Sequence, residues 1–278
     1  MFERIRSWRR KRVLATHALP DELWDEAVGM LSFLEIYDDA ELAALRDKVV
    51  LFLADKGIVG AHDFEVTPLM RVVIAIQACV LVLKLDPDAY AGWSNVVVYP
   101  DEFRPKVEYE DENGVVHMRD HEIAGEAWDG GPVLLSWADV LRSRDFEAAG
   151  MNLVIHEFAH KLDMKNGAAD GIPVLRAGMR IDEWKRIADA TYADFVTRVE
   201  AWEAAGESER DAPEIDPYAA DAPEEFFAVC SEVFFAAPEI LRDEYPEYYA
   251  QLTQYYGQDP AARHDRLMHV VPAQAGTQ

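Results

Sequence analysis

"NLVIHEFAHKLD", residues 152–163, decides how this chain is interpreted, because it places three ionisable side chains inside an apolar segment. Apolar residues recur at the spacing of a helix that faces a core, and Asn152 precedes them as a capping residue. The segment therefore predicts a buried helix that carries the pattern H-E-x-x-H.

Three polar residues of this helix have the spacing of a catalytic zinc site. His156 and His160 are four residues apart, so their imidazole rings project from one face and can share one ion. Glu157 lies beside them and can reach a water on that ion without binding the metal. The alternative is a core helix with hydrogen-bonded histidines. It is disfavoured, because three buried ionisable groups are costly without a metal or ion partners.

A catalytic zinc site needs a third protein ligand, and this part of the chain does not supply one. No further histidine follows in "KLDMKNGAADG", residues 161–171. Cys79 and Cys230 both lie in apolar segments, so we interpret them as reduced packing residues. The third ligand is then expected to be a glutamate on a second helix.

A second apolar helix is predicted within "EIDPYAADAPEEFFAVCSEVFFAAPEIL", residues 214–241. Asp221 is expected to cap its start, with Glu224 as the partner of the cap. Glu225 and Glu232 are seven residues apart and share one face of the helix. The pattern alone does not decide which of these two glutamates is the ligand.

The rest of the sequence predicts an α+β fold that is mostly helical and has a small mixed sheet. Asn113-Gly114 predicts a hairpin turn within one of the strand segments. Helices are expected over residues 20–34, 38–57 and 67–85, and strands over 94–100, 106–120 and 131–137. We expect residues 1–92 to form a helical N-terminal lobe packed on the rest as one unit, 93–262 a catalytic region and 263–278 a loosely ordered tail.

Composition excludes several classes of protein. The charge of −25, from 27 basic and 52 acidic residues, argues against direct nucleic-acid binding. The longest apolar run, residues 72–83, is too short to cross a bilayer. No apolar leader follows the basic residues 4–12, which are expected to form a solvated terminus; contact with an acidic partner or lipid is the alternative. We expect a cytoplasmic protein without membrane contact.

Several segments together resemble the Mlc titration factor A family of zinc metallopeptidases. They include "VVVYPDEF", "GEAWDGGPVLLSW", "HEFAHKLDMKNG" and "IDPYAADAPEEFFAVCSEVFF", and the resemblance runs from "RVLATHALP" to "YPEYYAQLTQYYGQDP". It implies a zincin-like fold and aminopeptidase-like hydrolysis of peptides. It also implies, as an alternative function, sequestration of the glucose-responsive repressor Mlc or a similar transcription factor. "MKNG" departs from the turn expected after "HKLD", but that turn is not a ligand.

The resemblance also implies the missing ligand. The family's metal site is similar to that of the anthrax lethal factor catalytic domain, where a tyrosine precedes the glutamate ligand by seven residues. Tyr218 and Glu225 have that separation here. The resemblance thus implies one Zn²⁺ ion per chain on His156, His160 and Glu225, in a gluzincin-type site. Glu157 would be the general base, and Tyr218 would face the reacting carbonyl.

Three further features of the sequence each have two possible interpretations. Glu232 is expected to contact one of the metal-binding side chains rather than the metal itself. The alternative is that it is a surface charge. Asp163 is interpreted either as a partner of a ligand or as a solvated helix end. The strand at residues 132–136 is expected either to pair with an extended peptide or to pack in the core.

Overall fold

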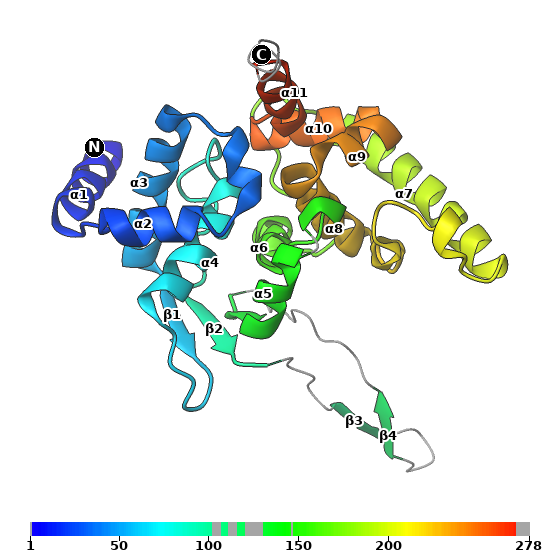
Figure 1. Ribbon diagram of the computed structural model, residues 1–278, viewed down its shortest axis with the longest axis horizontal. Coiled ribbons are helices and arrows are strands. Elements are labelled where there is room, and N and C mark those ends of the chain that lie inside the picture. Colours follow the sequence, from blue (N-terminus) through cyan, green and yellow to red (C-terminus); the bar gives the residue numbers. More distant parts are fainter. Residues whose placement is uncertain (1, 102–106, 111–115, 120–129, 146, 271–278) are drawn as a thin grey trace, which may run out of the picture.

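The computed structural model describes residues 2–101, 107–110, 116–119, 130–145 and 147–270 (Figure 1). It confirms a mostly helical α+β fold with a small sheet. The helices are α1 (Phe2–Thr16), α2 (Asp21–Val28), α3 (Asp39–Asp55), α4 (Pro68–Leu81), α5 (Trp137–Asp145), α6 (Leu153–Asp163), α7 (Ile181–Ala204), α8 (Pro223–Ala236), α9 (Pro238–Glu244), α10 (Pro246–Tyr256) and α11 (Pro260–Val270). The strands are β1 (Gly57–Gly60), β2 (Asn95–Tyr99), β3 (Val107–Glu110), β4 (Val116–Arg119) and β5 (Val133–Ser136).

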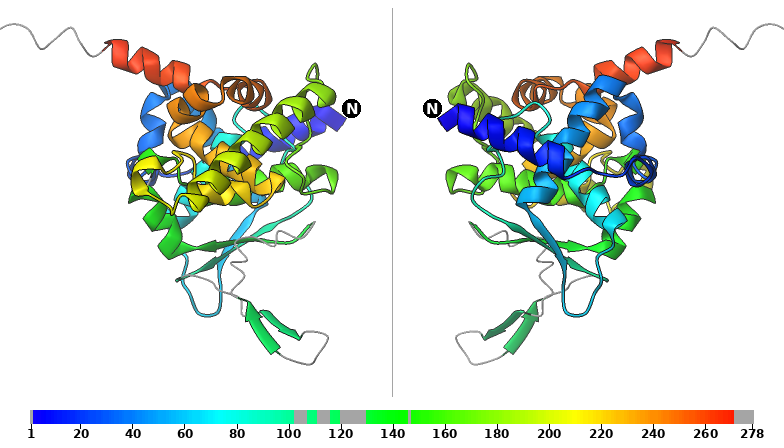
Figure 2. Two further views of the ribbon diagram at one scale, coloured as in Figure 1. Left: turned by 90° about the vertical axis from the view of Figure 1, so that its right-hand side faces the viewer. Right: turned by 90° about the vertical axis from the view of Figure 1, so that its left-hand side faces the viewer.

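The strands form a parallel sheet and a separate antiparallel pair, rather than one mixed sheet. The sheet has the order β1-β2-β5, and β3 pairs with β4. Ile58, Val96 and Val133 lie in register across the sheet and are buried. Figure 2 shows most helices gathered on one side of the sheet and the β3–β4 pair on the other. Asn113-Gly114, the expected turn, lies outside the described residues.

Local signals explain where the central helices begin. Thr67 accepts a hydrogen bond from the backbone N–H of Met70 at 3.2 Å, which caps the start of α4. Asn152 likewise caps α6 by accepting from the N–H of Ile155 at 3.0 Å. The expected cap of α8 is wrong: Ala222, not Asp221, is the N-cap residue, and it makes no side-chain cap. The proline at the first position of α8 lacks an N–H, so the helix has one donor fewer to satisfy.

The structure differs from the predicted elements in several places. The helix expected over residues 20–34 ends at Val28, and a 3-10 helix follows over Ser32–Ile36. β1 was not predicted, because its four residues include two glycines and directly follow a long helix. α11 extends to residue 270 and so includes part of the segment expected to be loosely ordered. The division of the chain near residue 92 stays a prediction.

The arrangement of the central helices positions the polar residues of the site. α6 packs against α4, β5 and α8, and it lies between α4 and α8 in Figure 1. α8 in turn contacts the short 3-10 helix η5 (Pro217–Ala220), which carries Tyr218. Among the described residues, no helix has the length and apolarity needed to span a membrane.

Candidate metal centre

α6 holds both histidines and the intervening glutamate in a nearly dry environment. His156 is 5% exposed, His160 is 4% exposed and Glu157 is 1% exposed. The apolar side chains Ile155 and Phe158 are fully buried, so they anchor the rest of the helix in the core. Burial of three ionisable groups on one short helix requires partners that compensate their desolvation.

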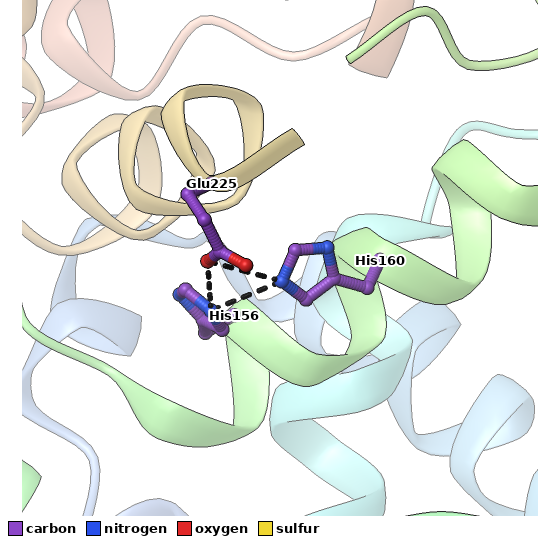
Figure 3. Close-up of side chains that lie close together, drawn as sticks. All are labelled: His156, His160 and Glu225. Carbon is purple, nitrogen blue, oxygen red and sulfur yellow. Dashed lines mark hydrogen bonds and ion pairs between the residues drawn. The ribbon is translucent and has the colours of Figure 1, made fainter. Parts of the chain in front are cut away.

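α8 supplies the third polar group of the cluster. The Glu225 side chain points from α8 toward the two imidazole rings that project from α6 (Figure 3). Its Oε2 atom lies 3.1 Å from His156 Nε2 and 3.4 Å from His160 Nε2. The two Nε2 atoms are 3.1 Å apart. The structure therefore brings together His156, His160 and Glu225, the ligand set that the family resemblance implies.

These three ligand atoms fit a small divalent metal. In a tetrahedral site with bonds of about 2.0–2.1 Å, neighbouring ligand atoms are about 3.3 Å apart. The separations between His156, His160 and Glu225, 3.1–3.4 Å, are close to that spacing. Within the described part of the chain, this is a cluster of histidine and acidic side chains that could hold a metal ion.

A hydrogen-bond chain orients the first histidine. His156 Nδ1 lies 2.7 Å from Glu232 Oε1, and the other oxygen of Glu232 accepts a bond from the backbone N–H of Asn152. A proton on Nδ1 leaves the Nε2 lone pair of His156 free to face a metal. Glu232 is 8% exposed, so the surface-charge interpretation of this residue is wrong.

Gln77 of α4 continues this hydrogen-bond chain and was not among the site residues predicted from the sequence. Gln77 Oε1 accepts a hydrogen bond from Asn152 Nδ2 at 2.8 Å, while its own amide group donates to the carbonyl of Val73 at 3.1 Å. The signal in the sequence was one amide side chain in an otherwise apolar run, over residues 72–83. A lone buried amide requires a polar partner, and here that partner is Asn152, the N-cap residue of α6.

Hydrogen bonds within the cluster strongly shift the pKa values of His156 and Glu225. Burial alone lowers the pKa of His156, but its hydrogen bonds to Glu225 and Glu232 raise that pKa well above the usual value. Burial alone raises the pKa of Glu225, but the hydrogen bonds from His156 and His160 lower it to about 2. A metal that binds here would displace a proton from His156 and would meet an ionised Glu225.

Glu157 stands apart from the three clustered ligand atoms. It is buried, and its Oε1 atom has no hydrogen-bond partner within the described residues. Burial raises the pKa of Glu157, while the neighbouring His156 and His160 lower it in part. A buried carboxylate that retains an unpaired oxygen is available to a water or a substrate proton.

Tyr218 approaches the cluster from η5. Its ring centroid lies 6.1 Å from that of His156, and Asp216 caps the turn by accepting from the Tyr218 N–H at 2.9 Å. Burial, followed by the negative charge of Glu225, raises the pKa of the Tyr218 phenol well above its usual value. The hydroxyl therefore keeps its proton at neutral pH and can serve as a hydrogen-bond donor.

Asp163, the last residue of α6, is fully buried, so the interpretation as a solvated helix end is wrong. Its Oδ2 atom accepts a hydrogen bond from the backbone N–H of Gly171 at 2.8 Å. Burial raises the pKa of Asp163 to about 6, although the Gly171 bond opposes this. The contact links the end of the histidine helix to the loop that follows it.

Comparison with known proteins identifies the family of the chain. Residues 5–257 match the family described as "Glucose-regulated metallo-peptidase M90". Proteins named Mlc titration factor A from Salmonella agona, Escherichia fergusonii and Cronobacter sakazakii are each 36% identical to the chain over 259 residues, which is 92% of this chain and 92% of each relative. The resemblance inferred from the sequence is confirmed. The chain belongs to the family of glucose-regulated metallo-peptidases M90.

Proposed function

We propose that this protein is a gluzincin-type zinc metallopeptidase with aminopeptidase-like activity, and that it binds one zinc ion through His156, His160 and Glu225. The observation that carries the proposal is the mutual approach of the three ligand atoms, at 3.1–3.4 Å, between two buried helices. Two imidazoles and one carboxylate leave a coordination position open, which is typical of catalytic zinc.

A purely structural zinc is the weaker alternative. Closed structural sites usually have four protein ligands and are rich in cysteine. Both cysteines here, Cys79 and Cys230, are buried in α4 and α8, and neither belongs to the cluster. A structural site would also give no role to the unpaired buried oxygen of Glu157.

The proposed chemistry assigns proton transfer to Glu157. Zinc in such a site supplies a Lewis acid that allows water to act as a nucleophile near neutral pH. Glu157 accepts a proton from that water as its oxygen bonds to the peptide carbonyl carbon. It then donates the proton to the amine nitrogen as the C–N bond breaks. Its position supports this role, because it is buried beside the cluster and its Oε1 atom has no hydrogen-bond partner among the described residues.

Tyr218 is proposed to stabilise the negative charge that develops on the carbonyl oxygen. Its phenol remains protonated and lies beside His156, so it can donate a hydrogen bond at the site of reaction. Phenylalanine at this position would retain the packing of the ring and remove the donor.

We propose that β5 binds the peptide by the edge that faces away from β2. Within the described residues, β5 pairs with β2 alone, so its other edge has backbone groups available for an extended chain. β5 also packs against α6, and Lys161 of that helix donates to the Gly131 carbonyl at 2.8 Å, just before the strand begins. Val133 and Leu135 are buried, so one face of β5 packs in the core while its edge serves the substrate.

Hydrolysis of small amino-acid anilides tests the enzymatic proposal. We expect activity from the zinc-loaded protein, loss of activity after zinc is removed with a chelator, and recovery when zinc is returned. Atomic absorption on the same samples should show about one zinc per chain. Activity that is unchanged in protein verified to be free of zinc would contradict the proposal.

A second candidate function is sequestration of a transcriptional repressor similar to Mlc, because the relatives carry the name Mlc titration factor A. The net charge of −25 suits a partner with a basic surface, such as a DNA-binding protein. Both functions place the protein in the cytoplasm, which is part of the proposal.

Co-purification with a purified Mlc-like repressor tests this second function. We expect the wild-type protein and the His156→Ala variant to retain the repressor equally, since the histidine is buried and the binding surface would lie elsewhere. Binding that requires His156 would locate the partner at the metal centre. Failure of the wild-type protein to bind would contradict the sequestration proposal.

A further inference from the structure

Two glycines flank the histidine helix, and both contact the helix that carries Glu225. Gly150 lies just before the Asn152 cap of α6, and Gly171 lies in the loop after α6. Both glycines are buried, and both have positive φ angles, +85° and +73°. Side chains rarely adopt such angles, and the two positions also lack the space for a side chain.

Gly171 contacts the first residue of α8. A Cβ atom at Gly171 would lie 2.6 Å from the carbonyl oxygen of Pro223 and 3.1 Å from its carbonyl carbon. These are backbone atoms, so a clash here can be relieved only by moving the start of the helix or the loop. Pro223 is two residues before Glu225, so such a movement would displace the proposed third ligand.

Hydrogen bonds hold Gly171 firmly in this position. Its N–H donates to Asp163 Oδ2 at 2.8 Å, which ties it to the end of α6. Its carbonyl accepts a bond from Trp184 Nε1 at 3.1 Å, and Trp184 is fully buried. Ala222, the N-cap residue of α8, makes no side-chain cap, so no capping side chain fixes the start of that helix beside Gly171.

Gly150 makes the equivalent contact farther along α8. A Cβ atom there would lie 2.8 Å from Val233 Cγ2 and 3.2 Å from Val233 Cα. Val233 follows Glu232, whose carboxylate accepts from the Asn152 N–H and contacts His156. The two glycines thus allow α6 and α8 to approach closely at both ends of the histidine helix.

We propose that Gly150 and Gly171 are positioning residues that set the separation of α6 and α8, and thereby the distance from Glu225 to the two histidines. The inference rests on the proposed metal site. Metal–ligand distances tolerate deviations of only about 0.2 Å. Relief of a 2.6 Å contact requires a shift of about 0.5 Å, which exceeds that tolerance.

The decisive comparison is between Gly171→Ala and Gly178→Ala. Gly178 lies in the same loop and has φ +96°, but a Cβ atom there would meet nothing within 4 Å. Both substitutions introduce similar backbone strain, and only the first introduces a clash with α8. We expect Gly171→Ala to weaken zinc binding by about 10- to 100-fold, as measured by competition with a chelator, and Gly178→Ala to match the wild type.

Cobalt(II) provides a readout that general destabilisation does not change. Its visible absorption depends on the number and geometry of the ligands. We expect an altered spectrum for folded Gly171→Ala and for folded Gly150→Ala, and the wild-type spectrum for Gly178→Ala. Wild-type zinc affinity and an unchanged cobalt spectrum in Gly171→Ala would overturn the inference. A wild-type protein that binds neither metal would instead overturn the proposed function on which it rests.

Two variants of Asp163 decide the matter if Gly171→Ala does not fold. Asn at position 163 removes the charge but keeps an acceptor for the Gly171 N–H, whereas Ala removes both. We expect Asp163→Ala to bind zinc at least about tenfold more weakly than Asp163→Asn. Equal zinc affinities of the two variants would show that the hydrogen bond between Asp163 and Gly171 does not influence the metal site, and would overturn the inference.

Discussion

Replacement of Glu157 by Gln is expected to lower kcat for anilide hydrolysis by about 10²- to 10⁴-fold, the contribution typical of general acid–base catalysis. Gln has the same shape as Glu, so it fits the buried site of Glu157. It cannot accept a proton from water at neutral pH, and it has no proton to return to the amine. Zinc affinity should change little, because Glu157 is not among the clustered ligand atoms.

Two further variants separate this loss from other effects. His160→Ala is expected to lose both zinc and activity, whereas Glu157→Gln should lose activity alone. Glu224→Gln makes the same change of charge next to Glu225, at a residue outside the cluster, and should retain activity. Equal activity of zinc-loaded Glu157→Gln and wild type would contradict the proposed mechanism.

The helices of the site could be predicted because their signals are local. The bounds of α6 and its Asn152 cap follow from a periodic apolar pattern and one capping residue. β1 could not be predicted, since two of its four residues are glycines and the two apolar residues between them are too few to show a strand pattern. It becomes a strand because it pairs with β2, which lies more than thirty residues farther along the chain.

The choice between Glu225 and Glu232 shows where the sequence is insufficient. Their shared face was predicted, and in the structure both side chains do contact His156. They meet different nitrogens of the same ring, Glu225 at Nε2 and Glu232 at Nδ1. Only the placement of α8 across α6 separates the two, and that placement depends on tertiary contacts such as those of Gly150 and Gly171.

Glu232 is expected to support both the fold and the metal site, and two substitutions separate these contributions. Glu232→Ala leaves two buried donors, the Asn152 N–H and His156 Nδ1, without their acceptor. Each unsatisfied donor costs about 1–3 kcal/mol, so the free energy of unfolding should fall by about 2–6 kcal/mol. Urea denaturation of the metal-free protein measures this loss.

Glu232→Gln should preserve most of that stability and still impair zinc binding. The amide oxygen of Gln can accept from the Asn152 N–H, but its NH₂ group then faces His156 Nδ1. A donor at that position favours the tautomer with its proton on Nε2, the nitrogen that faces Glu225. We expect zinc affinity to fall by about 10- to 100-fold in both variants, with a large loss of stability only in Glu232→Ala. Wild-type zinc affinity in Glu232→Gln would show that this carboxylate does not set the tautomer of His156.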